Sequence, residues 1–266
     1  MLAECSNNLR QIGVGCNIYA TANNDYWPCI NLPGSSENFY QTYLACRTTG
    51  IPSTQISSGP YGFGQLYFYA GVNPRAFYCP SVETGIFSYS YYDAPGYPWP
   101  AITPADVGDP NNNGNAFVRC GYNYYPQSKT TTTVSGPAGN VIVGAVTFVD
   151  TTFTPPNPPG GYQNSITTPA QLKTAQLNLS KAVAVDALKT WAQINHQFRG
   201  QAYGINALFP DGHVRFQTVA GNNKKLSNKP FDSELWDPVI NGGPGESNLA
   251  GGGSYAGFII MNGFQP

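Results

Sequence analysis

Four residues in the second half of the chain are the best candidates for chemistry: Asp186, His196, Asp211 and His213. Carboxylates and imidazoles can bind a metal or transfer protons, but this spacing matches no zinc signature. A structural role is simpler, because Asp211 begins an Asp-Gly turn and can hydrogen-bond its own backbone. His196 would then bond that turn and hold two segments together. We predict a structural clip, and a metal site and catalysis remain the alternatives.

A second candidate site lies in the segment 109–115, where Asp109, Asn111 and Asn113 place oxygen-bearing side chains at alternate positions. A glycine follows at the sixth position, as at the start of a calcium-binding loop. The twelfth position is Cys120 rather than Glu, so the segment is not an EF-hand. We expect a solvated turn, with a calcium-stabilised loop as the alternative, and no other cofactor.

The chain contains six cysteines: Cys5, Cys16, Cys29, Cys46, Cys79 and Cys120. None forms a Cys-x-x-Cys pair, which argues against zinc-ribbon and thioredoxin-like sites. The even count allows disulfides, which would indicate an oxidising compartment, whereas buried thiols that pack as small hydrophobes are the alternative. The candidate pairs are Cys29 with Cys46 and Cys79 with Cys120.

Aromatic residues gather in the irregular segment 84–116, namely Tyr89, Tyr91, Tyr92, Tyr97 and Trp99. Such a cluster can form a glycan-binding or adhesive face, since aromatic rings give large contact area at low entropy cost. We favour the other interpretation, in which the rings pack loops onto the core.

The overall composition narrows the function classes. Only 10% of the 266 residues are charged and the net charge is -1, so no basic surface for nucleic acid is expected. No G-x-S-x-G motif and no apolar run of about 18 residues are present. No signal-peptide pattern is visible either. The chain is therefore either cytoplasmic or has lost an N-terminal segment.

The elements that must position these residues begin with a helix over 4–22. One apolar face recurs at three- and four-residue steps: Leu9, Ile12, Cys16, Tyr19 and Ala20. Gly13 and Gly15 weaken this prediction, and the run 23–25 is a stop signal. A short aromatic helix is predicted over 62–71, an extended piece over 77–80, and strands over 118–125, 140–146 and 182–186.

The clearest local prediction is a hairpin over 205–218, with Asp211-Gly212 as a two-residue turn. This register pairs Phe209 with Val214, Ala207 with Phe216, and Ile205 with Thr218. One face is then almost wholly apolar, and the other, which includes Asn206 and Leu208, is mostly polar. Together the elements predict an α+β fold: an N-terminal helix packed on a mainly antiparallel sheet, with long irregular loops.

Several segments together resemble bacterial type IV pilin-like or pseudopilin-like proteins. The resemblance lies in 5–13 (CSNNLRQIG), 23–28 (NNDYWP), 73–81 (NPRAFYCPS), 121–124 (GYNY) and 206–216 (NALFPDGHVRF). Such proteins end in a domain named for a His, nine residues and an Asp-Gly. Here fourteen residues separate His196 from Asp211, and the extra length falls in 197–204.

The resemblance implies a structural subunit of a type IV pilus-like or type II secretion-like filament, not an enzyme. Residues 1–28 would be the C-terminal half of a long pilin-like helix, whose membrane-embedded part is missing here, and 29–266 the globular domain. The partners of the chain would be other pilin-like subunits. It would be anchored in the inner membrane before assembly and would end in the periplasm, at the cell surface or in an extracellular filament. A glycan-binding or adhesive module and a metal-dependent hydrolase are the alternatives.

Overall fold

The structure is a computed structural model of the whole chain, and it describes residues 2–28, 44–48, 59–60, 62–85, 87–93, 116–136, 139–144, 172–186, 196–198, 201–218, 264 and 266. The helices are α1 (Leu2–Ala22), α2 (Phe63–Ala70) and α3 (Tyr89–Tyr92), with 3-10 turns η2 (Pro74–Phe77) and η3 (Thr174–Gln176). The strands are β1 (Leu44–Thr48), β2 (Gly59–Pro60), β3 (Ala116–Arg119), β4 (Tyr122–Tyr124), β5 (Thr131–Gly136), β6 (Gly139–Gly144), β7 (Ala184–Asp186), β8 (His196–Phe198), β9 (Gln201–Leu208) and β10 (Val214–Thr218).

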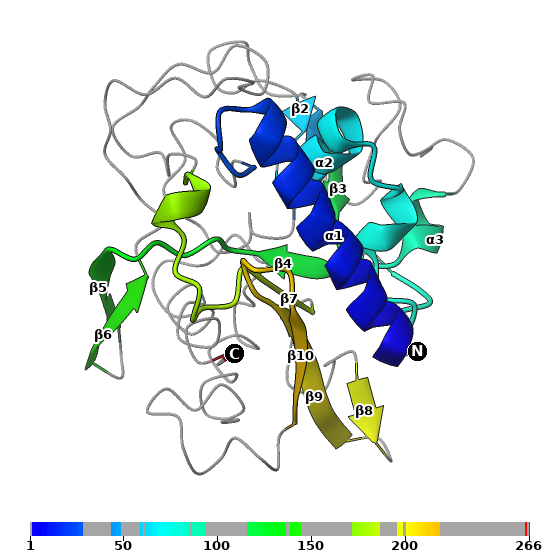
Figure 1. The fold of residues 1–266 in the computed structure, drawn as a ribbon. Helices are drawn as coiled ribbons and strands as arrows, with labels where there is room; N and C mark the ends of the chain where they lie inside the picture. Colours follow the sequence, from blue (N-terminus) through cyan, green and yellow to red (C-terminus); the bar gives the residue numbers. More distant parts are fainter. Residues whose placement is uncertain are drawn as a thin grey trace.

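The strands form three antiparallel sheets, and the largest one carries the residues of interest. Its order is β10-β9-β7-β4, and β8 pairs with the first part of β9. Helix α1 runs diagonally across the molecule and contacts α2, η2, β9 and β10 (Figure 1). The predicted α+β class, with an N-terminal helix packed on an antiparallel sheet, is confirmed.

Helix α1 matches its prediction closely. All five residues of the predicted apolar face are buried. The helix ends at the predicted stop signal, where Asn24 (φ 54°) and Asp25 (φ 66°) take the left-handed conformation and the Asp25 N–H donates to the Ala20 carbonyl. Asn and Asp tolerate this conformation better than other side chains. The sequence therefore defines both the buried face and the end of α1.

The two glycines of α1 allow close packing. A Cβ atom on Gly13 would lie 3.1 Å from Cδ1 of Leu208, and one on Gly15 would lie 2.5 Å from Cγ2 of Val72. The residues that weaken the helix by propensity therefore let it approach β9 and the segment after α2.

The other predicted elements are present with adjusted ends. Helix α2 ends as predicted at Gly71, whose φ is 64°. Phe77 closes η2, so the predicted extended piece begins at Tyr78. The predicted strand 118–125 is two strands, β3 and β4. They separate at Gly121, where a Cβ atom would lie only 3.0 Å from the Cys79 backbone nitrogen. Strand β7 lies within its predicted segment, and β6 begins one residue before its predicted segment, at Gly139.

The hairpin is present, but its predicted register is wrong by one residue. The structure pairs Val214 with Leu208 and Phe216 with Asn206. The Gly212 N–H donates to the Phe209 carbonyl, so Pro210 occupies the first central position of the turn. Proline has the φ that this position needs, and Gly212 follows with φ 88°. The turn therefore contains three residues, 210–212, rather than two.

The register change pairs the two β9 residues of the predicted polar face, Asn206 and Leu208, with Phe216 and Val214. Asn206 and Leu208 are fully buried, and both contact α1. The Ser6 hydroxyl donates to Oδ1 of Asn206, and Leu208 lies against Gly13. Both faces of β9 are buried, since Ile205 and Ala207 are also inaccessible.

We predict that Gly204→Ala destabilises the hairpin by about 2 kcal/mol or more, because overpacking has this cost even where neighbours can move. A Cβ atom there would lie 2.4 Å from the Gln217 carbonyl oxygen, a backbone atom of the paired strand. Gly13→Ala is the matched control, because its nearest contact would be the flexible end of Leu208 at 3.1 Å and the nearest backbone atom, Cα of Gly212, would lie at 3.6 Å. The substitution also gains helix propensity. Its expected change is within about 1 kcal/mol. Urea unfolding measures the free energy of unfolding of both variants, and equal losses for Gly204→Ala and Gly13→Ala would contradict this prediction.

Candidate functional site

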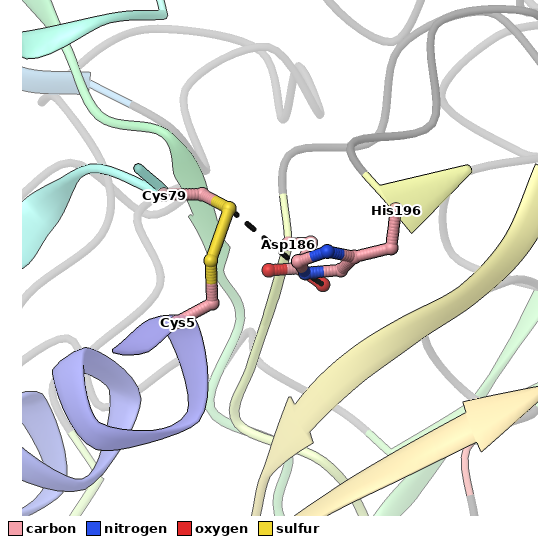
Figure 2. Close-up of side chains that lie close together, drawn as sticks. All are labelled: Cys5, Cys79, Asp186 and His196. Atoms are coloured by element: carbon pink, nitrogen blue, oxygen red, sulfur yellow. Dashed lines mark hydrogen bonds and ion pairs between the residues drawn. A yellow bond between two sulfur atoms is a disulfide. The ribbon is translucent and has the colours of Figure 1, made fainter. Parts of the chain in front are cut away.

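Two cysteines, an aspartate and a histidine come together in the interior, where α1 meets the sheet. Cys5 comes from the first turns of α1, Cys79 follows η2, Asp186 ends β7 and His196 begins β8. Their sulfur, oxygen and nitrogen atoms lie within 4.8 Å of one another. Figure 2 shows the Cys5–Cys79 disulfide beside the side chains of Asp186 and His196, whose Oδ2 and Nε2 atoms lie 3.1 Å apart. We call these four residues the buried cluster.

Asn206, in β9, connects the cluster to the sheet and to the helix. Its backbone N–H and its side-chain amide both donate to Oδ2 of Asp186, at 2.6 and 3.1 Å. Its Nδ2 also lies 2.8 Å from Nε2 of His196, while its Oδ1 accepts from Ser6. One asparagine therefore joins α1, β7, β8 and β9.

His196 is held from two sides through one ring atom. Its Nε2 lies 2.8 Å from the Asn206 amide nitrogen and 3.1 Å from Oδ2 of Asp186. With a proton on Nε2 the ring donates to the carboxylate, and without one it accepts from the amide. In both tautomers these contacts join β8 to β7 and β9.

A tyrosine lies on the helix side of the cluster. The Tyr122 hydroxyl donates to the Cys5 carbonyl at 3.5 Å and is fully buried. Burial, followed by the negative charge of Asp186, raises the pKa of Tyr122 well above its ordinary value, although a hydrogen bond with Asn8 opposes the shift. The phenol therefore stays protonated and acts as a donor, not as a base.

The cysteine pairing differs from the prediction. Cys79 is bonded to Cys5, so the predicted pair of Cys79 with Cys120 is wrong, and Cys120 is a buried thiol. The pairing follows from the fold, since Asn8 donates to the Tyr78 carbonyl and this brings the start of α1 beside residue 79. Cys29 and the side chain of Cys46 lie outside the described residues.

The four residues predicted as a structural clip form two separate pairs. His196 bonds Asp186 and Asn206 and not the turn, so the predicted contact with Asp211 is wrong. Asp211 and His213 pair with each other at the exposed hairpin tip. The reason is the extra length in 197–204, which forms the β8–β9 hairpin. A clip is present, but it joins β7, β8 and β9.

At the hairpin tip, the Asp211 carboxylate accepts hydrogen bonds from the backbone and the ring of His213. Partial burial would raise the pKa of Asp211, but these bonds and the His213 charge outweigh it and lower the pKa. A lowered pKa in the folded state means that the contact contributes above the ordinary pKa and is lost as the pH falls. We expect His213→Ala to raise the pKa of Asp211 in an NMR titration; an unchanged value would contradict this assignment.

The remaining predicted sites are described only in part. The calcium-loop candidates Asp109, Asn111 and Asn113 lie outside the described residues, as do Tyr97 and Trp99. Of the other tyrosines, Tyr92 is buried, and Tyr89 and Tyr91 pack against the core. These three rings therefore favour the packing interpretation over a glycan-binding face.

Sequence reasoning missed Cys5 and Asn206 as members of the site. Cys5 shares the buried face of α1 with Leu9 and Ile12, one turn earlier, which is the signal that could have placed it in the interior. Asn206 offered the opposite signal, since an asparagine alternating with apolar residues suggests a solvated face.

The cluster can stabilise structure or hold an ion, but it is closed to substrates. Its four residues are at most 5% exposed. A catalytic acid or base must lie within hydrogen-bond reach of its substrate. The arrangement therefore favours a structural role.

Comparison with protein-family models, with curated proteins and with solved structures finds no match for this chain. None of the helices in the described part of the chain has the length and apolar character that a membrane crossing requires.

Proposed function

We propose that this chain is a structural subunit of a type IV pilus-like or type II secretion-like filament. The observation that supports it best is the two-sided character of α1. Its inner face packs on α2 and β9 and is joined to the domain by the Cys5–Cys79 disulfide. Its outer face carries Val14 and Ile18, one turn apart, with exposed fractions of 59% and 49%.

An outer face of this kind suits packing between subunits. Apolar surface gains about 25 cal/mol for each Å² removed from water, so exposed valine and isoleucine on a helix favour association. The low content of charged residues, 10%, limits repulsion between identical neighbours. In this proposal α1 continues a pilin-like helix, and its outer face contacts the helices of other copies.

The proposed partners are other pilin-like subunits, and the proposed place is the periplasm or cell surface after anchoring in the inner membrane. The disulfide agrees with such an oxidising compartment. Filament growth would not require an enzyme activity from this chain.

Shearing of the cells that naturally make the protein tests this proposal. An antibody raised against the chain should detect it in the sheared fraction and should label filaments under the electron microscope. An antibody against a cytoplasmic protein is the control for cell lysis. Detection only in the cell body, with unlabelled surfaces, would contradict the proposal.

A further inference from the structure

The buried cluster contains two sulfurs, an imidazole nitrogen and a carboxylate from four separate elements. This donor set suits Zn²⁺, which binds cysteine, histidine and carboxylate ligands in closed tetrahedral sites. Four donors at zinc bond lengths lie roughly 3.5 to 3.8 Å apart. The donor atoms here lie within 4.8 Å of one another, so small shifts would bring them onto one ion.

A second observation points to a ligand at the same place. Oδ1 of Asp186 is buried and accepts no hydrogen bond from the described residues. A buried carboxylate oxygen without a partner is costly, since buried polar groups are normally satisfied. Nε2 of His196 also faces this space, 3.9 Å from Sγ of Cys79, and would exchange its contact with Asn206 for the metal.

We propose that reduction of the Cys5–Cys79 disulfide converts the buried cluster into a structural zinc site with Cys5, Cys79, His196 and Asp186 as ligands. The disulfide and the metal are then alternative links between α1 and the rest of the domain. Which of them is present depends on the redox state of the compartment. The proposal does not depend on the filament function.

The conversion balances in two steps. The reductant gives two electrons to the disulfide, whose S–S bond breaks. With a phosphine, one water molecule supplies the two thiol protons and the oxygen of the phosphine oxide. With a dithiol, its own two thiol protons pass to Cys5 and Cys79 as it closes to a cyclic disulfide. Zn²⁺ then displaces the two thiol protons to solvent as two S–Zn bonds form. Asp186 contributes Oδ1, to which none of the described residues donates, and can keep its bonds from Asn206 through Oδ2.

Cobalt substitution tests the site directly. The full chain, reduced with a phosphine under anaerobic conditions, is titrated with Co²⁺, whose thiolate charge-transfer and visible bands report tetrahedral sulfur ligation. We expect one Co²⁺ per reduced chain, displaced by Zn²⁺, and none in the oxidised chain. His196→Ala should weaken binding by about tenfold or more, since even loss of a residue that only supports a ligand has that effect. Cys16→Ala is the control, because this buried thiol lies outside the cluster. The cobalt bands of the reduced Cys16→Ala variant should match those of the unaltered chain.

A second measurement uses the unaltered chain, so it does not depend on the folding of any variant. The reduced protein is alkylated with and without Zn²⁺, and the modified peptides are mapped by mass spectrometry. Zinc should protect Cys5 and Cys79 at least tenfold, and circular dichroism should show a folded chain in both samples. Absence of cobalt bands in the folded reduced chain, or equal alkylation of both cysteines with and without zinc, would overturn the proposal.

Discussion

Asp186→Ala is expected to lower the free energy of unfolding by about 3 to 5 kcal/mol, the range for removing one partner from a buried polar or ionic contact. Oδ2 of Asp186 accepts from the backbone and the side chain of Asn206, and both donors lie in the interior. Without the carboxylate, those donors and the ring of His196 lose their partner in a region closed to water.

The hairpin tip provides the matched control for this variant. Asp211 also pairs with a histidine, but its side chain is 54% exposed. Asp211→Ala should therefore cost under about 1 kcal/mol, as exposed pairs do. Asp186→Asn, which keeps an acceptor oxygen and removes the charge, should fall between the two. Urea unfolding measures all three, and similar losses at positions 186 and 211 would contradict the assignment of the buried clip.

The Cys5→Ala/Cys79→Ala double variant is expected to lose about 4 kcal/mol, measured by urea unfolding with a chelator present. The disulfide closes a loop with a sequence separation of 74, and a cross-link of that span restricts the unfolded chain by roughly this amount. It also attaches the start of α1, the element that covers Asn206 and Leu208. The lost stability should therefore appear in two ways: the urea concentration at the unfolding midpoint falls, and the backbone amides of α1 are less protected from hydrogen exchange.

Two comparisons distinguish the stability lost with the disulfide from the stability lost when a buried side chain is shortened. Cys16→Ala removes another fully buried sulfur and should cost only about 1 kcal/mol, as small deletions in a core do. A reducing agent should destabilise the unaltered chain and leave the double variant unchanged. Equal sensitivity of the two proteins to the reducing agent would rule out the Cys5–Cys79 link.

Local patterns predicted the elements of this fold well, because they depend on neighbouring residues. The spacing of Leu9, Ile12 and Cys16 defined the buried face of α1, and Gly71 marked the end of α2. The turn of the hairpin was harder, since Asp211-Gly212 alone suggests a two-residue turn. Pro210 changes the turn, because the fixed φ of proline suits the first central position of a turn that begins at Phe209. The burial of Asn206 was not predicted because both faces of β9 are buried, so the alternation that suggested a solvated face does not apply to this strand.

The site depends on contacts that are remote in the sequence, so residue types could suggest it but not assemble it. Asp186 and His196 were predicted as members of one clip, and the structure pairs them. Their further partner, Asn206, comes from the strand whose register was wrong. The pairing of Cys5 with Cys79 requires knowing how α1 lies on the domain, and six cysteines allow 15 complete pairings.

The outer face of α1 is where the filament proposal can be tested most directly. A photo-crosslinking amino acid placed at Val14 or Ile18, in the cells that naturally make the protein, should join identical copies into dimers and higher multimers on illumination. The same group at Leu179, which is 57% exposed but lies outside α1, is the control and should give far less product. Multimers from positions 14 and 18 are the result we expect; only monomers from all three positions would contradict a filament built on this helix.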